Sequence, residues 1–157
     1  MKLLLLVIGK TDEDHLAAGI KKYVGRIVHY ASFEMKELPD PRNRKTLSEE
    51  QQKKAESLLL LQQLQPADHV VLLDENGKQF SSVAFAESLE KQMVSGAKRL
   101  VFVIGGPYGF APEVYDRANA RLSLSPMTFS HQMVRLIFVE QLYRAFTILK
   151  GEPYHHQ

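Results

Sequence analysis

Runs of apolar residues alternate along the chain with segments of helical periodicity. The runs at 2–9, 69–74 and 99–106 are nearly continuous in Val, Ile and Leu, which is typical of strands buried on both faces. Residues 32–38 alternate between apolar and polar side chains, and 121–125 predicts a short fifth strand. Helical spacing predicts helices over 12–29, 47–64, 83–94, 112–118 and 131–150.

The order of these elements predicts an α/β fold. Alternating strands and helices favour a mainly parallel sheet between two helix layers, a three-layer α/β/α sandwich. No repeat or linker interrupts the pattern, so we expect a single domain over 1–157. Two local signals refine the boundaries. Ser48 with Gln51 predicts a helix N-cap, and Asn76–Gly77 predicts a turn after the third strand.

Length and composition limit the possible settings. The 157 residues suffice for one substantial core. The absence of cysteine excludes disulfides and thiolate zinc sites, and fits the cytoplasmic location that we expect. The first apolar run, Leu3 to Ile8, is too short for a signal-peptide core or a membrane span, so no membrane association is expected.

Basic residues gather in two places although the net charge is only +2. From Lys98 onward, seven Lys and Arg residues face four acidic residues. A second basic cluster, PRNRK at 41–45, lies in a predicted loop. Such patches suit a polyanion such as nucleic acid, although ordinary solvated charges would explain them equally well.

Two segments after predicted strands could form a binding pocket. VIGGPYGF brings Gly105, Gly106 and Gly109 to the end of the fourth strand, where a main chain can approach a ligand closely. It matches neither GxGxxG after a first strand nor the P-loop, which argues against an NAD enzyme or an NTPase. Taken alone, it is more often only a tight turn.

The second segment, LSLSPMTFSHQMVR at 122–135, joins the fifth strand to the last helix. Its main chain could bond an adenine edge while Met127 and Phe129 pack on the ring. An ordinary connection capped by Ser130 is the alternative.

The last predicted helix is apolar nearly all round, so it must be buried on more than one side. In a chain this small, we expect a second subunit to provide part of the cover, and therefore a homodimer. His131 and Arg135 lie one turn apart, with a site and a structural role equally open. Glu140 and Arg144 form another such pair, for which we favour a structural or interface role.

The combination of IGGPYG, LSLSPMTF, SHQMVR, EQLYRAF and a terminal PYHH resembles the ribosomal RNA large subunit methyltransferase H family of the SPOUT class, over essentially the whole chain. The resemblance implies a C-terminal trefoil knot, with a cofactor-binding region at about 69–157, and a homodimer. It also implies that S-adenosylmethionine is used to methylate N3 of a pseudouridine in 23S rRNA of the assembled ribosome.

The resemblance further implies the site residues. Leu73 borders the cofactor pocket, the main chain of Gly105 approaches the cofactor, and a loop wraps it. Tyr154 and His155 belong to a tail that folds over the cofactor near the target base. The residues of the wrapping loop are Leu124, Ser125, Pro126, Met127, Thr128 and Phe129.

Methyl transfer from a sulfonium is a direct displacement that needs no metal, so no metal site is expected. It does need alignment and a proton acceptor near neutral pH, which suits His131 or His155. Arg135 would stabilise negative charge on the ring or hold a phosphate, and Tyr154 would position the base. The main alternative is a noncatalytic RNA-binding module. A metal site at His155 and His156 is a poor third, because the two residues are adjacent and the chain offers no cysteine and no acidic cluster near them.

Overall fold

Five parallel strands form one sheet in the computed structural model, which describes residues 1–156. The strand order is β2-β1-β4-β3-β5. The strands are β1 (Lys2–Ile8), β2 (Ser32–Leu38), β3 (His69–Gln79), β4 (Arg99–Ile104) and β5 (Ala120–Ser123). The helices are α1 (Asp14–Ile27), α2 (Glu49–Gln63), α3 (Ser82–Val94), α4 (Pro112–Arg117) and α5 (Met133–Leu149), with a 3-10 turn at Arg44–Thr46.

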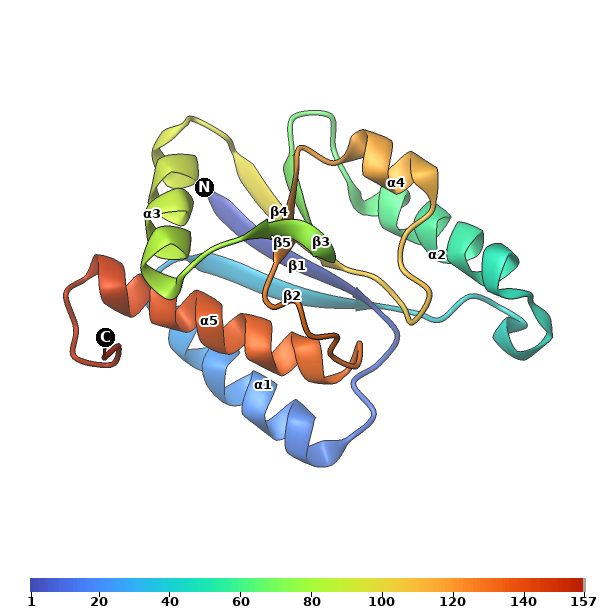
Figure 1. Ribbon diagram of the computed structural model, residues 1–157, viewed down its shortest axis with the longest axis horizontal. Helices are drawn as coiled ribbons and strands as arrows, with labels where there is room; N and C mark the ends of the chain where they lie inside the picture. The colour runs from blue at the N-terminus through green and yellow to red at the C-terminus, as the bar shows by residue number, and fades with distance from the viewer. Residues whose placement is uncertain (157) are drawn as a thin grey trace.

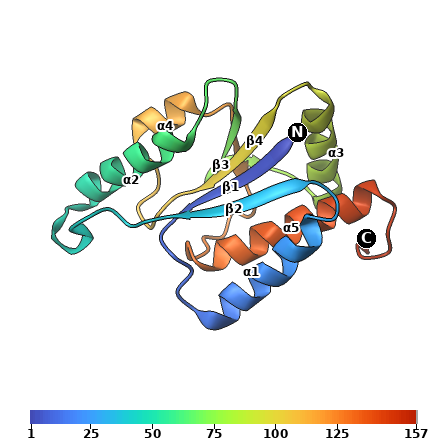
Figure 2. The same cartoon turned by 180° about the vertical axis from the view of Figure 1, so that it is seen from behind.

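Helices cover both faces of the sheet, which confirms the three-layer prediction (Figures 1 and 2). On β1, Leu3, Leu5 and Val7 pack in a core with α1, α3 and α5. Leu4 and Leu6 pack in a second core with α2 and α4. Successive strand residues point to opposite faces, so burying both faces requires the continuous apolar run seen in the sequence.

The predicted helix start at Ser48 is confirmed. Its hydroxyl accepts a hydrogen bond from the main chain of Gln51, whose side chain bonds back to the Ser48 N–H. This reciprocal pair satisfies two N–H groups that the first helical turn leaves free.

The predicted turn at Asn76–Gly77 is wrong. Strand β3 continues to Gln79, and both Leu73 and Lys78 pair with Leu122 of β5. The residues of β3 between Leu73 and Lys78 form a bulge against the parallel strand β5. A Cβ at Gly77 would lie 2.7 Å from the main chain of Arg121. An Asn-Gly pair favours a turn that reverses the direction of the chain. Here pairing with β5 on both sides of the bulge keeps the chain running in the same direction.

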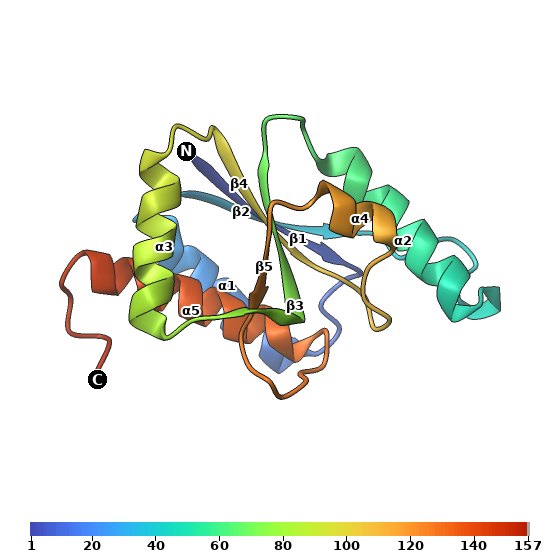
Figure 3. The ribbon, with the colours of Figure 1, turned by 45° about the horizontal axis from the view of Figure 1, so that its top comes forward.

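Helix α5 is covered mainly by its own chain. It lies on the sheet between α1 and α3 (Figure 3). The face that carries Met133, Ile137 and Arg144 has no buried residue. The apolar surface of α5 therefore gives less support for a second subunit than the sequence suggested, and the homodimer stays a prediction. Within residues 1–156, no helix is both long and apolar enough to cross a bilayer.

Candidate functional site

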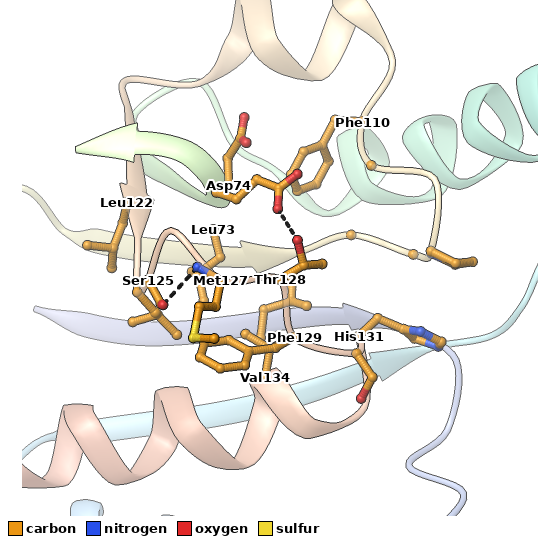
Figure 4. A pocket seen from close by; sticks show the side chains of 18 of the residues that line it. Leu73, Asp74, Phe110, Leu122, Ser125, Met127, Thr128, Phe129, His131 and Val134 are labelled. Carbon is orange, nitrogen blue, oxygen red and sulfur yellow. Dashed lines mark hydrogen bonds between the residues drawn. The ribbon is translucent and has the colours of Figure 1, made fainter. Parts of the chain in front are cut away.

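A cavity of about 320 Å³ lies at the carboxyl ends of β4 and β5, beside the middle of β3 where its pairing with β5 shifts (Figure 4). This edge of a parallel sheet is where α/β proteins bind ligands. Three segments supply most of its lining: the middle of β3, the turn after β4, and the loop between β5 and α5. The lining residues are Leu73, Asp74, Glu75, Ile104, Gly105, Gly106, Pro107, Gly109, Phe110, Tyr115, Leu122, Leu124, Ser125, Met127, Thr128, Phe129, Ser130, His131 and Val134.

The turn after β4 offers main chain to this cavity. Gly109 has φ of +79° and donates its N–H to the Gly106 carbonyl at 3.2 Å. Gly106 has no room for a side chain, since a Cβ there would lie 2.5 Å from Oε1 of Glu56. Glycine is needed at Gly109 for its backbone conformation and at Gly106 for close packing.

Helix α2 supports this turn from behind. The Ser57 hydroxyl accepts a hydrogen bond from the Ala111 N–H at 3.1 Å, while the Glu56 carboxyl lies against Gly106. Glu56 is only 2% exposed, and burial raises its pKa. Our sequence reasoning missed Glu56. The available signal was its position four residues before the buried Leu60, which puts a carboxyl on the apolar stripe of the helix.

The loop between β5 and α5 is held by its own hydroxyl groups. Ser125 Oγ accepts from the Met127 N–H at 3.0 Å, and Ser123 Oγ donates to the Ser125 carbonyl. Thr128 Oγ1 donates to Glu75 Oε2 at 2.6 Å and ties the loop to β3 (Figure 4). Ser130 caps the first turn of α5 by accepting from the Met133 N–H.

Of the eight residues predicted to bind the cofactor, seven line the cavity, although they come from three separate segments. Pro126 is the exception: it lies in the same loop but not in the lining. Met127 as a whole residue is 77% exposed. The cavity therefore brings the predicted residues together without assigning a contact to each.

The charges around the cavity are mainly acidic. Asp74 and Glu75 line it, and His131 is the only basic side chain among the described lining residues. Arg121 lies 4.0 Å from Asp74 and partly balances it. Burial, and next the positive charge of Arg135, lower the pKa of His131, so its imidazole is neutral at pH 7 and able to accept a proton.

Arg135 does not reach the cavity. Its side chain is fully buried, and Nη1 donates to the Gly9 carbonyl at 2.8 Å and to Thr11 Oγ1 at 3.0 Å. Nη2 donates to the Ile8 carbonyl, and Nε to the His131 carbonyl at 3.3 Å. The guanidinium therefore secures the end of β1 and the main chain of His131, which favours the structural alternative over contact with a substrate.

The tail that carries Tyr154 and His155 lies at the opposite end of α5 from the cavity (Figure 1). Seventeen residues make α5 about 25 Å long. Tyr154 donates its hydroxyl proton to Glu140 Oε1 at 2.9 Å, and His155 Nδ1 lies 3.1 Å from Arg144 Nη1. The tail thus packs on the face of α5 that carries Met133, Ile137 and Arg144, which we call the open face. It lies outside the cavity of its own chain.

Tyrosine rings surround this docked tail. Tyr154 packs edge-on against Tyr143 with centroids 4.8 Å apart, and its hydroxyl lies 3.5 Å from that of Tyr23. Burial and the hydrogen bonds with Tyr23 and Glu140 raise the pKa of Tyr154. Its phenol therefore stays protonated through the neutral range and remains a hydrogen-bond donor.

Known proteins match this chain over nearly its whole length. A family model described as "Predicted SPOUT methyltransferase" matches residues 1–155. Three proteins called ribosomal RNA large subunit methyltransferase H align over 157 residues, which is the full length of both chains in each case. The identity is 60% for Christiangramia forsetii, 59% for Phocaeicola vulgatus and 57% for Parabacteroides distasonis. The similarity thus includes the cavity and the tail.

Proposed function

The chain belongs to the SPOUT methyltransferase family, and we propose that it methylates N3 of a pseudouridine in 23S rRNA of the assembled ribosome, with S-adenosylmethionine as methyl donor. Full-length identity of 55–60% with ribosomal RNA large subunit methyltransferases supports the reaction class most directly. The proposal also includes the trefoil knot and the cytoplasmic location.

The cavity residues fit S-adenosylmethionine. The glycine turn allows a ligand to approach the main chain, and Leu73, Leu124 and Phe129 provide apolar surface for an adenine ring. Asp74 and Glu75 suit a ligand that carries positive charge. When bound, the cofactor supplies a methyl group activated by its sulfonium.

We assign proton acceptance and base positioning to the histidines and the tail. The target N3 carries a proton that must leave as the N–C bond forms. The neutral imidazole of His131 at the cavity can accept it, directly or through water, and His155 is the second candidate. The hydroxyl of Tyr154, held as a donor, would orient the base. Arg135 would act indirectly, by holding the main chain of His131.

A homodimer would bring the cavity of one chain together with the C-terminal tail of the other. The tail of one chain lies at the far end of α5 from its own cavity, so closure over a bound cofactor requires the tail of a second copy. The open face of α5, with Met133, Ile137 and Arg144, is the surface that we assign to this contact.

The basic loop at 41–45 would contact RNA phosphates. Arg44 donates to Asp40, the Asp40 carboxyl lies beside Gly9, and Arg135 of α5 binds the Gly9 carbonyl. The loop is thereby linked to the N-terminal end of α5, where His131 lines the cavity. A polyanion bound there would lie beside the transferred methyl group.

Incubation with labelled S-adenosylmethionine and ribosomes that lack the modification tests the proposal. We expect one methyl group per 23S rRNA, mapped to N3 of a pseudouridine. Binding to ribosomes without any methyl transfer would instead favour the noncatalytic RNA-binding alternative.

A further inference from the structure

Glu56 is a buried carboxyl that the mechanism above does not use. Its Oε2 accepts a hydrogen bond from Gln52 Nε2 at 3.2 Å, and Gln52 is itself buried. Within residues 1–156, Oε1 has no hydrogen-bond partner. A buried carboxyl oxygen without a partner is costly, and native structures rarely contain one.

The position of this carboxyl relates it to the cavity. Glu56 lies directly against Gly106, and Gly106 lines the cavity. The next residue, Ser57, holds Ala111 at the other end of the same turn. Because glycine has no side chain, the Glu56 carboxyl packs directly against the main chain of Gly106, and that same main chain lines the cavity.

The donor and the product of the proposed reaction differ by one charge. S-adenosylmethionine carries a positive sulfonium, whereas S-adenosylhomocysteine, left after the methyl group departs, carries a neutral thioether. The two ligands share nearly the same shape, so packing alone discriminates weakly between them. A negative charge behind the cavity wall would discriminate, because a buried charge is poorly screened by solvent.

Resting on the proposed function, we propose that the Glu56 carboxylate, acting through the main chain of Gly106, makes the cavity prefer the positively charged methyl donor to its neutral product. Glu56 acts without touching the cofactor. Its effect favours binding of the donor and release of the spent product.

The inference includes a pH dependence with a defined sign. In the free protein, burial raises the pKa of Glu56; Asp40 raises it further, while the Gln52 hydrogen bond and Arg44 lower it. A bound cation lowers that pKa, so binding of the donor releases a proton. Affinity for the donor should therefore rise with pH up to the pKa of Glu56 in the free protein, and then level off.

Titration calorimetry with the two ligands tests this inference, using full-length wild type, Glu56→Gln, and Glu50→Gln as control. Glu50 lies on the same helix, and its side chain is 82% exposed. We expect Glu56→Gln to weaken S-adenosylmethionine binding about tenfold while S-adenosylhomocysteine stays within about twofold. Proton release, measured in two buffers, should fall with Glu56→Gln and not with Glu50→Gln.

The readout is a ratio of two affinities on one variant, so partial misfolding would affect both ligands and cancel. Equal weakening of both ligands, or no change in either, overturns the role of Glu56. Failure of the wild type to bind S-adenosylmethionine would instead overturn the proposed function itself.

Discussion

The hydroxyl of Tyr154 donates a 2.9 Å hydrogen bond to Oε1 of Glu140, and Arg144 donates to the same oxygen. The Arg144 guanidinium also lies 4.7 Å from the centre of the Tyr154 ring. These contacts fold the C-terminal tail back on α5. They order Tyr154 and His155 in advance, at a distance from the cavity of the same chain.

Deletion of the last four residues should abolish methyl transfer and spare the fold. Tyr154 and His155 contact the surface of α5, and residues 154–156 contribute no side chain to either core. We expect circular dichroism to be unchanged and the product yield on ribosomes to fall to background. Tyr154→Phe, which loses the hydrogen bonds to Glu140 and Tyr23, each worth about 1 kcal/mol, is the milder comparison. Full activity of the deletion variant would refute the assigned role of the tail.

Arg135→Ala should destabilise the protein strongly. It leaves the buried carbonyls of Ile8 and Gly9 without their donor and opens a cavity beneath α5. We expect a loss of about 3–5 kcal/mol in urea denaturation. Arg144→Ala, on the open face, should cost about 1 kcal/mol. If Arg135→Ala were as stable as the wild type and lost only activity, a catalytic role would be restored.

The rate of methyl transfer should fall at low pH because His131 becomes protonated; this fall is the acid limb of the pH profile. Because burial lowers its pKa, the imidazole stays unprotonated, and active as a proton acceptor, to a pH below the ordinary histidine value. The rate should thus rise with pH through a pKa under about 6.5 and then level off. Single-turnover rates of wild type and His131→Asn across this range provide the measurement.

His155→Asn is the matched comparison for the pH profile. If His131 is the acceptor, only His131→Asn removes the acid limb. Loss of the limb in His155→Asn alone would assign proton acceptance to the tail.

Gly106→Ala should lose cofactor binding, because its Cβ would collide with the Glu56 carboxyl. Double replacement with Glu56→Ala should recover thermal stability by removing the collision. Gly25→Ala is the control: a Cβ there meets nothing within 4 Å, and the change should stabilise α1 by about 0.5–1 kcal/mol. An unchanged melting temperature for Gly106→Ala would contradict the packing described for the turn.

Neutralising the basic loop should weaken ribosome binding and its salt dependence. Replacing Arg42, Arg44 and Lys45 with Gln removes up to three phosphate contacts, so the slope of log affinity against log salt should fall by about 2–3. Cofactor affinity, measured without ribosomes, should not change. An unaltered salt slope would exclude the loop from RNA contact.

The regular elements could be predicted because each follows from local pattern. The continuous apolar run of β1 and the Ser48 capping box are properties of neighbouring residues, and both are confirmed. The turn at Asn76–Gly77 failed for a non-local reason. Pairing with β5, some 45 residues further along the chain, outweighs the local preference.

The candidate site likewise contains some residues that the local sequence indicated and others that only long-range packing placed. Glycines after β4 and small residues after β5 made a pocket plausible, because binding at strand ends is a general rule of α/β sheets. The family resemblance, and not the local pattern, selected Gly105 and the loop at 124–129 as cofactor-binding residues. Nothing local to Glu56 indicated that its carboxyl would lie against Gly106. Likewise, helical spacing placed Arg135 beside His131 without showing that its guanidinium turns toward the end of β1.

The sequence by itself therefore determined the elements, their layers and the segments that line the cavity, since periodicity and capping act over a few residues. Only the tertiary structure decided which polar groups are buried together and how far the tail lies from its own cavity. Those outcomes depend on the packing of segments distant in the chain, such as α2 behind the glycine turn and α5 across β1. Burial and hydrogen-bond partners arise only from that packing, and they separate a structural arginine from a catalytic one.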